Sequence, residues 1–542
     1  MLMLKANHLQ QSFGDRLIFR VESIQVHEHE RVGIVGLNGA GKTTLLMILA
    51  KESEPEHGEV VHFGDAAVIP QLEGPAAPTG EKSASRWHVA GVDSGWMSGG
   101  ERTRKKIAVA FEQEAHLLFA DEPTSHLDLG GIEQLEDELN RYRGTVFLIS
   151  HDRELMDAVC TKIIEIEDGE IREYNGNYSA YREQKAHRRE REQFEYEQYV
   201  KEKRRLEAAA ADKTERAAKM KKTPKRMGNS EARLHKMDAK GKKAKLDRAV
   251  KAIESRLEQL ESKEKPKALE AVQFDMQAFS PVKGKFAVRF DRVSKTVGER
   301  TLFRDFSCTV KPGMKVALVG NNGAGKTTLL KMVAGAAEGI TVAGSGKVGF
   351  FRQDLSTLDE GKSIYENVAE GSPYSETMIR TLLARLLFKR EDVWKPVSVL
   401  SGGERMKVAL AQRFLAGENI LLLDEPTNYL DVFTQERLEE VLAAYPGTIL
   451  LATHDRRLLN RTVDHVIVFE DETPVSFDGN YAAYLRAKRM RNNSSGGNEL
   501  ERLKLDNALA EVIGKLSLVV DSAEKETLEE RYQILLEQRR NL

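Results

Sequence analysis

Short apolar runs bounded by turn residues recur along the chain, and the pattern around them alternates between strand-like and helix-like. ERVGIVGLNGAGKTTLL at residues 30–46 reads as an apolar strand, a glycine-rich turn and the start of a helix. HLLFADEP at 116–123 and ENILLLDEP at 418–426 are apolar runs that end in carboxylates. Short continuous apolar runs of this kind are typical of buried parallel strands. We therefore predict α/β domains in which strands alternate with helices.

The pattern changes between about residue 179 and residue 266. This stretch is charged and rich in alanine and glutamate, and it has no strand signal. It predicts two long helices that are broken at TPKRMGNS, residues 223–230, because Pro224 and Gly228 both interrupt helix geometry. Asn229 or Ser230 can cap the returning helix.

The end of the chain carries a second, smaller helical pattern. RNNSSGG at 491–497 reads as a flexible linker. Apolar residues at helical spacing follow in two stripes, so we expect a helical hairpin there. The stripes are Leu509, Ile513, Leu516 and Val520, then Leu528, Tyr532 and Leu535.

Comparison of the chain with itself shows an internal repeat. GLNGAGKTTLL at Gly36 returns as GNNGAGKTTLL at Gly320, and SGGER at Ser98 returns at Ser401. DEPT, the dipeptide His-Asp and GNY also return, in the same order and at the same offset as SGGER. Five ordered blocks do not arise by chance, so one domain is used twice. The offset of the glycine-rich turn is smaller than that of the other blocks, so the first copy lacks a piece before SGGER.

The repeat divides the chain into four parts. We assign residues 1–181 and 285–490 to the two copies of the domain. Residues 182–284 form the helical linker, and 491–542 form the C-terminal extension.

Composition narrows the class of protein. The 542 residues are 41% hydrophobic and 31% charged, with a formal net charge of −2 and two cysteines. Two distant cysteines fit a reducing compartment and argue against a zinc site or a disulfide framework. The start of the chain, MLMLKANHLQQSFGDR, shows no basic region followed by an apolar core, and no apolar run approaches the length of a membrane span. We expect a soluble cytoplasmic protein.

Both glycine-rich turns match the eight-residue phosphate loop in full. Glycine lets backbone N–H groups close around a β-phosphate, a lysine neutralises the β- and γ-phosphates, and a threonine hydroxyl can bind Mg²⁺. A glycine-rich structural turn is the alternative, and the strand and helix context, present twice, argues against it. The residues expected to bind nucleotide are Gly36, Leu37, Asn38, Gly39, Ala40, Gly41, Lys42, Thr43 and Thr44, and then Gly320, Asn321, Asn322, Gly323, Ala324, Gly325, Lys326, Thr327 and Thr328.

The carboxylates and histidines after the other strands suit phosphoryl chemistry. An aspartate at the strand end can hold the Mg²⁺ shell, and the next glutamate can polarise the attacking water as a general base. Taken alone, such a pair is more often a helix cap or surface charge, but the repetition favours the catalytic assignment. The histidines can contact the γ-phosphate. The expected catalytic residues are Glu122, Glu425, His151 and His454, and the expected metal site consists of Thr43, Gln71, Asp121, Thr327, Gln353 and Asp424.

In this order, the phosphate loop, the glutamine, SGGE, DEPT and the histidine resemble ABC-type ATPase domains, and the resemblance covers both copies. It implies head-to-tail pairing, in which the SGGE of one domain closes on ATP held by the other. It adds Ser401, Gly402, Gly403 and Glu404 to the site of Lys42, and Ser98, Gly99, Gly100 and Glu101 to that of Lys326. Phe13 is placed to stack on adenine, whereas the matching position of the second copy is Val297.

The charge and length of the linker discriminate between the possible functions of an ABC protein. From Lys213 to Lys251 the chain carries 15 lysines and arginines against four acidic residues. Concentrated like charge repels itself unless it meets an anion, so an RNA or DNA backbone is the natural partner. An ATPase subunit of a membrane transporter would not need such a linker. A DNA-repair ABC ATPase would carry zinc-binding cysteines or much longer coiled coils.

Tandem ABC domains, a basic helical linker and no membrane segment resemble the ABC-F family. Gln71 and Ser98 lie much closer together in the chain than Gln353 and Ser401 do, so the arm of the housekeeping members is absent. This, the long linker and the C-terminal hairpin resemble the antibiotic-resistance group of Vml, Vga and Lsa type. A general translation factor that rescues stalled ribosomes is the alternative.

The resemblance implies a monomer that binds ATP and Mg²⁺, occupies the exit site of the 70S ribosome and places its linker tip beside the P-site tRNA and 23S rRNA, without binding DNA. It implies release of a bound lincosamide, streptogramin A or pleuromutilin. The tip residues expected to contact RNA are Lys221, Lys222, Lys225, Arg226 and Met227.

Overall fold

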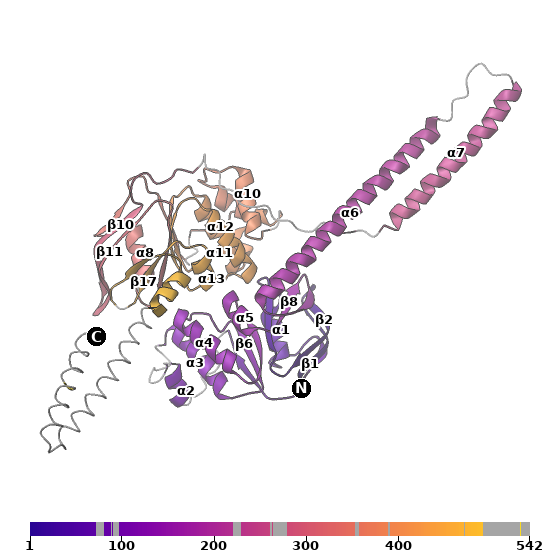
Figure 1. The fold of residues 1–542 in the computed structure, drawn as a ribbon. Coiled ribbons are helices and arrows are strands. Elements are labelled where there is room, and N and C mark those ends of the chain that lie inside the picture. Colours follow the sequence, from indigo (N-terminus) through magenta and orange to yellow (C-terminus); the bar gives the residue numbers. More distant parts are fainter. Residues whose placement is uncertain are drawn as a thin grey trace.

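The computed structural model describes residues 1–71, 81–87, 89, 97–219, 229–260, 263, 279–352, 357–388, 391–470, 472–490 and 532. Two α/β domains lie against each other, and a rod of two long helices projects from their junction (Figure 1). The linker tip at 220–228, Gln353 and the C-terminal extension apart from Tyr532 lie outside the described residues. Among the described residues, no helix is both long and apolar enough to cross a membrane.

The first domain is built on a nine-stranded sheet of order β4-β1-β2-β9-β8-β3-β7-β6-β5. Neighbouring strands from β8 to β5 run parallel, and β9 pairs antiparallel with β8. The strands are β1 Leu2–Phe13, β2 Arg16–His27, β3 Arg31–Gly36, β4 His57–His62, β5 Ala66–Ile69, β6 Leu117–Asp121, β7 Thr145–Ile149, β8 Lys162–Glu167 and β9 Glu170–Asn175. The helices are α1 Lys42–Leu49, α2 Glu81–Arg86, α3 Gly99–Glu112, α4 Leu129–Arg141 and α5 Arg153–Val159.

The second domain repeats the parallel core in a six-stranded sheet of order β14-β15-β16-β12-β17-β18, beside a separate three-stranded sheet β11-β10-β13. Its strands are β10 Val288–Val297, β11 Arg300–Val310, β12 Lys315–Gly320, β13 Ile340–Val342, β14 Val348–Phe351, β15 Ile420–Asp424, β16 Thr448–Ala452, β17 His465–Phe469 and β18 Val475–Asp478. Its helices are α8 Lys326–Ala334, α9 Ile364–Ala369, α10 Glu376–Arg385, α11 Gly402–Leu415, α12 Val432–Ala444 and α13 Arg456–Arg461, with 3₁₀ turns at Asp392–Trp394 and Val397–Val399.

The parallel strands are buried on both faces, as their continuous apolar runs require. In β6, Leu118 belongs to the hydrophobic cluster under α3 and α4, whereas Leu117 and Phe119 belong to the cluster under α1. The predicted α/β class with two tandem domains is therefore confirmed. Between β5 and α3 the described part of the first domain holds only the short helix α2, where the second domain has α9 and α10.

The linker rod consists of α6, Tyr178–Lys219, and α7, Asn229–Glu258. The two helices run side by side, and Arg256 of α7 lies 3.6 Å from Glu202 of α6. At a rise of ~1.5 Å per residue, the 42 residues of α6 extend roughly 60 Å. The predicted pair of long linker helices is thus present.

Candidate active site

Each phosphate loop connects the central strand of its sheet to the helix behind it. In the first copy the loop runs from β3 to α1. Gly41 has a φ of 95° at the start of the helix, a backbone conformation that residues other than glycine rarely adopt. The Lys42 ammonium donates hydrogen bonds to the carbonyl oxygens of Gly36 at 2.9 Å and Leu37 at 3.2 Å. The lysine is thus folded over its own loop, which is where phosphates are expected to bind.

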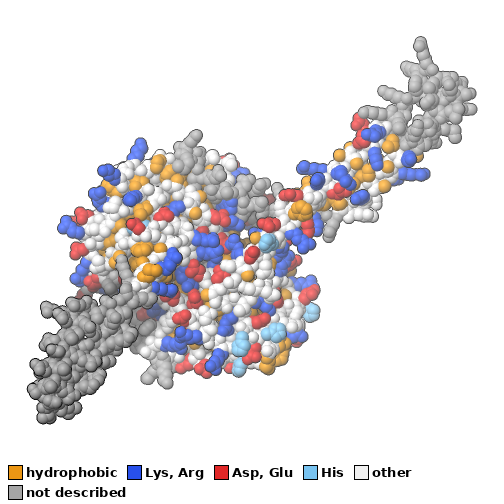
Figure 2. Space-filling view, in the orientation of Figure 1, with side chains coloured by type: hydrophobic (Ala, Val, Ile, Leu, Met, Phe, Trp, Pro, Cys, Tyr) orange, Lys and Arg blue, Asp and Glu red, His pale blue; other side chains and the backbone are white. Residues whose placement is uncertain are grey.

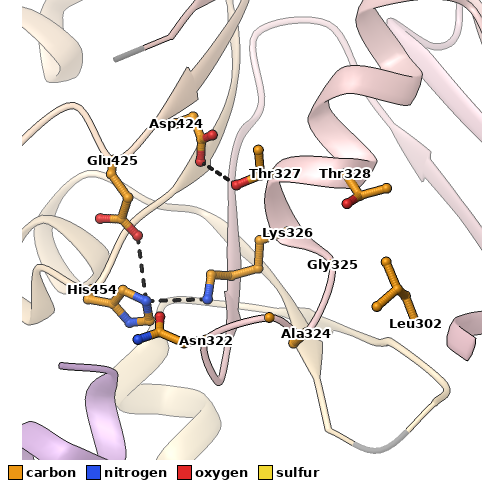
Figure 3. A pocket seen from close by; sticks show the side chains of 11 residues that line it. Leu302, Asn322, Ala324, Gly325, Lys326, Thr327, Thr328, Asp424, Glu425 and His454 are labelled. Carbon is orange, nitrogen blue, oxygen red and sulfur yellow. Dashed lines mark hydrogen bonds and ion pairs between the residues drawn. The ribbon is translucent and has the colours of Figure 1, made fainter. Parts of the chain in front are cut away.

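The second loop has the same geometry (Figure 3). The Lys326 ammonium lies 2.6 Å from the Gly320 oxygen and 3.1 Å from the Asn321 oxygen. It also lies 3.3 Å from Nε2 of His454. The loop borders a cavity of about 210 Å³ with Asp424, Glu425, His454 and Leu302. These residues come from four elements, and the parallel sheet brings the carboxyl ends of its strands together at one edge.

The expected general bases lie at the ends of β6 and β15. Glu122 and Glu425 have φ values of 48° and 47°, a strained conformation that both copies keep. Each backbone N–H donates to the end of the next strand, at Ile149 and Ala452. Burial raises the pKa of both carboxyl groups to about 8, although Lys42 and Lys326 oppose the shift. Strained, buried carboxyl groups with raised pKa values are typical of catalytic sites.

The two histidines contact these glutamates. Nε2 of His151 lies 3.2 Å from Glu122, and Nε2 of His454 lies 3.6 Å from Glu425. Burial and the neighbouring lysine lower the pKa of each imidazole to about 3. Both rings are therefore neutral at physiological pH and can accept or donate one hydrogen bond at the γ-phosphate position.

The threonines and aspartates expected to hold Mg²⁺ fit a divalent cation. The Thr327 hydroxyl donates to Asp424 at 3.0 Å, so the two oxygen ligands already converge. Both carboxylate oxygens of Asp121 are buried without a hydrogen-bond partner, and this burial raises the pKa of Asp121. Hard oxygen ligands left unsatisfied in a phosphate site suit Mg²⁺. Gln71 is exposed, and its backbone oxygen accepts a hydrogen bond from Lys106 at 3.2 Å.

The SGGE segments begin helices that point at the opposite domain. Ser98 and Ser401 are the N-caps of α3 and α11, and each forms a capping box with the glutamate three residues later. A Cβ at Gly100 would come within 2.9 Å of the His126 carbonyl oxygen, so only glycine fits. The N-termini of these helices are suited to bind anions.

The two domains meet head to tail. Asn38 of the first loop donates from its side chain to the Tyr429 oxygen at 2.9 Å, and Asn322 of the second donates to the His126 oxygen at 2.9 Å. Ser98, Gly100 and Glu101 line one cleft of about 540 Å³ together with Asn321 and Asn322. Each SGGE helix therefore faces the phosphate loop of the other domain.

Sequence reasoning missed a reciprocal pair of arginines at this interface. Arg153 follows His151 by two residues, is 1% exposed and forms an ion pair with Glu439 of α12. Its counterpart Arg456 follows His454 and lies 2.7 Å from Glu136 of α4. The signal was present, because the sequence His-Asp-Arg occurs in both copies.

The stacking of adenine on Phe13 stays a prediction. Phe13 and Val297 are 63% and 56% exposed, and Val297 is not among the residues that line the second cavity. Leu302, which the sequence did not single out, borders the second phosphate loop. Its counterpart in the repeat is Ile18, whose side chain lies against Gly41.

Two composite sites, each between the phosphate loop of one domain and the SGGE helix of the other, define an ABC-type ATPase with both domains in one chain. A family model described as ABC transporter matches residues 20–88 and 303–428, and a second model of the same description matches 164–240. The archaeal ribosome recycling factor aABCE1, in a crystal structure with ribosomal stalk protein aP1, shares the fold with a TM-score of 0.61. That match is 20% identical and covers 89% of this chain and 92% of aABCE1.

Curated relatives narrow the class to one family. The ribosome protection protein VmlR of Bacillus subtilis (strain 168) is 34% identical over 520 residues, 93% of this chain and 92% of VmlR. The erythromycin resistance ATP-binding protein MsrA of Staphylococcus epidermidis is 32% identical over 470 residues, 85% of this chain and 96% of MsrA. The chain belongs to the ABC-F family of ATPases.

Proposed function

We propose that this ATPase binds the ribosome and protects it from antibiotics that act at the peptidyl-transferase centre. The observation that carries the proposal is the similarity to VmlR along nearly the whole chain, linker included. The rod of α6 and α7 supports it, since it extends far enough from the ATPase domains to enter a tunnel lined with RNA.

The charges along the rod agree with RNA as the partner. On the stem of α6, acidic and basic side chains pair along the helix, as in Arg191 with Glu195 at 3.0 Å and Arg205 with Glu202 at 3.1 Å. Figure 2 shows both signs of charge along this part of the rod. Such pairs neutralise the stem. The segment from Lys213 to Lys251, toward the far end of the rod, holds 15 basic residues against four acidic ones. The tip is therefore proposed to bind phosphates, and the stem to carry it.

The chemistry follows from the two composite sites. Lys42 and Lys326 neutralise the β- and γ-phosphates of ATP, and the SGGE helix of the opposite domain closes on the γ-phosphate. Mg²⁺, when bound to the threonine hydroxyl and the aspartate, offsets the negative charge of the phosphates. Glu122 or Glu425 accepts a proton from water as its oxygen bonds to the γ-phosphorus and the bond to ADP breaks.

Closure is the state proposed to fit the exit site of the 70S ribosome, and hydrolysis reopens the domains and releases the protein. In the closed state the tip residues Lys221, Lys222, Lys225, Arg226 and Met227 are proposed to lie beside the P-site tRNA and 23S rRNA, where they displace the drug. Ribosome binding places the protein in the cytoplasm, as a monomer whose two ATPase domains pair within the chain.

The test compares drug susceptibility in cells that express variants at equal levels. Replacing Thr223 to Ser230 with a short glycine-serine turn is expected to keep ATPase activity and abolish protection against lincosamides, streptogramin A and pleuromutilins. The matched charge-only variant, Lys225→Ala with Arg226→Ala, is expected to lower affinity, so that higher expression partly restores protection. Full protection by the glycine-serine variant contradicts the proposed role of the tip.

Two further outcomes identify the alternatives. A wild-type protein that gives no protection to any drug but restores translation on stalled ribosomes is a general translation factor. A protein that sediments with membranes and permease subunits, and not with ribosomes, is a transporter subunit. With ATP, we expect co-sedimentation with ribosomes that weakens steeply as salt rises, because phosphate contacts release counterions.

A further inference from the structure

The base of the linker is fastened to the first ATPase domain by a buried carboxylate. Glu165 of β8 is fully buried and accepts hydrogen bonds from the hydroxyls of Tyr174 at 3.0 Å and Tyr181 at 2.6 Å. It also forms an ion pair with Lys185, which lies one turn further along α6. Because β8 pairs with β3, the strand before the phosphate loop, these contacts attach α6 to the same sheet that carries the first ATP site.

The same helix also touches the second domain. The Tyr178 hydroxyl donates to Glu436 of α12 at 2.9 Å, and Arg182, one turn later, forms an ion pair with Glu436. The Lys185 ammonium lies 4.9 Å from the centre of the Phe433 ring, also on α12. Glu436 itself is 11% exposed at its side chain and lies 4.0 Å from Arg153, two residues after the histidine of the first site.

The repeat supplies an internal comparison. The counterpart of Tyr178 is Tyr481, and the counterpart of Glu436 is Glu133. Burial and then the charge of Glu133 raise the pKa of Tyr481 to about 12. The counterpart of Arg182 is Leu485, which packs against the core of the second domain. The ion pair to the opposite domain is therefore specific to the helix that becomes the linker.

We propose that Glu436 is a positioning residue that ties the direction of the linker helix to closure of the two ATPase domains, through Tyr178 and Arg182. Since α6 is fixed to the first domain and Glu436 belongs to the second, these contacts form only when the domains are together. Because such coupling is reciprocal, a contact that holds the linker in this direction must favour closure of the domains by the same free energy. The inference rests on the ATP-driven closure in the proposed function, but not on the ribosome or on any drug.

Distances between spin labels measure closure and linker direction separately. Exposed positions are available on α6 at Gln198, on α4 at Asp137 and on α10 at Thr377, each changed to cysteine in pairs. Cys308 is changed to serine, while Cys160 is buried. The 137–377 pair reports domain closure, 198–377 reports the linker against the second domain, and 198–137 reports the linker against the first. Closure is driven with Mg²⁺ and a non-hydrolysable ATP analogue.

The informative variants are Arg182→Leu, which copies the second repeat, and Glu436→Gln. Each is expected to lower the closing equilibrium about two- to fivefold, the range of a partly exposed ion pair with an added hydrogen bond. The 198–377 distribution should broaden at saturating analogue, while 198–137 stays unchanged. The double variant should show no further loss, because both changes break one interaction. Arg182→Lys keeps the cation and should restore most of the closing equilibrium.

Glu133→Gln is the matched control, because it makes the same chemical change at the counterpart position, and it should leave the 198–377 distribution unchanged. An equal effect of Glu133→Gln, or unchanged closure and unchanged 198–377 distances in both informative variants, overturns the role of Glu436. If the parent protein does not close at all with the analogue, the ATP-driven clamp of the proposed function is overturned with it. The two failures are thus distinguishable.

Discussion

The buried pair of Arg153 and Glu439 gives the sharpest energetic prediction. Glu439→Gln removes the charge that faces Arg153, and the arginine side chain is 1% exposed in the closed arrangement. Removing one partner of a buried ion pair costs about 3–5 kcal/mol. Asp455 at 3.6 Å and Glu436 at 4.0 Å still face the guanidinium, so we take the lower end, about 3 kcal/mol.

The matched change in the other half is Glu136→Gln. Its partner Arg456 is 11% exposed and keeps Asp152 at 3.4 Å and Glu154 at 3.5 Å. The free energy of closure that Glu136→Gln removes should then equal that of one hydrogen bond to a charged group, about 1.5 kcal/mol. At about 1.4 kcal/mol per tenfold change, the closing equilibrium falls roughly 140-fold for Glu439→Gln and roughly 12-fold for Glu136→Gln.

Steady-state ATPase measurements distinguish these values. Two ATP molecules bind in the closed form, so the ATP concentration for half-maximal rate rises with the square root of the fall in the closing equilibrium. We expect it to rise about 12-fold for Glu439→Gln and about 3.5-fold for Glu136→Gln. The maximal rate should be retained, since neither glutamate touches the nucleotide. Thermal unfolding of the nucleotide-free protein is the control, because water solvates Arg153 when the domains separate. Equal rises of the half-maximal ATP concentration in both variants would refute the assigned difference between the two ion pairs. So would a lower Tm of the nucleotide-free variant that is large enough to explain the weaker closure.

Three other predictions concern the ATP sites. Glu122→Gln with Glu425→Gln should retain ATP binding and lower turnover at least ~10²-fold, and normal turnover would show that neither is the base. In the nucleotide-free wild type the pKa of both carboxyl groups is raised from 4.5 to about 8. The stability that these groups contribute is complete below their ordinary pKa, so it should fall by about 1.4 kcal/mol per pH unit per site as pH rises from there to about 8, and denaturation of the double variant should lack this slope. Val297→Phe should tighten nucleotide binding at the second site about fivefold if adenine stacks there as expected at Phe13, as measured by titration, and unchanged affinity would place adenine against other residues.

The fold and the phosphate loops could be predicted because their signals are local. Glycines in a turn, a lysine at a helix start and carboxylates after an apolar strand act within one segment. The SGGE signal is local as well, because Ser98 and Glu101 form a capping box within a single helical turn. The parallel sheet then brings these segments to one edge.

The contacts between the domains could not be predicted in the same way. Arg153 and Glu439 lie in different copies of the repeat, and each has the sequence surroundings of an ordinary surface residue. Glu165 lies in a strand whose neighbouring residues are apolar, and its buried role depends on three side chains that follow later in the chain. Long-range charge pairing leaves no periodic pattern. Only repetition, as in His-Asp-Arg, indicated that these positions matter.

The attachment of α6 has a consequence for how such proteins diversify. Lys185 reaches Glu167 at 2.9 Å at the start of the linker, and Lys488 reaches Glu470 at 2.6 Å at the end of the second copy. The duplicated domain thus offers the same attachment point twice, with α6 continuing from the first and the C-terminal extension following the second. Whatever follows Lys185 or Lys488 can lengthen, shorten or change its sequence while the nucleotide chemistry beneath is preserved. Natural variation and protein design should therefore both produce new specificities by exchanging the segments that follow Lys185 and Lys488, while the two ATPase domains stay unchanged.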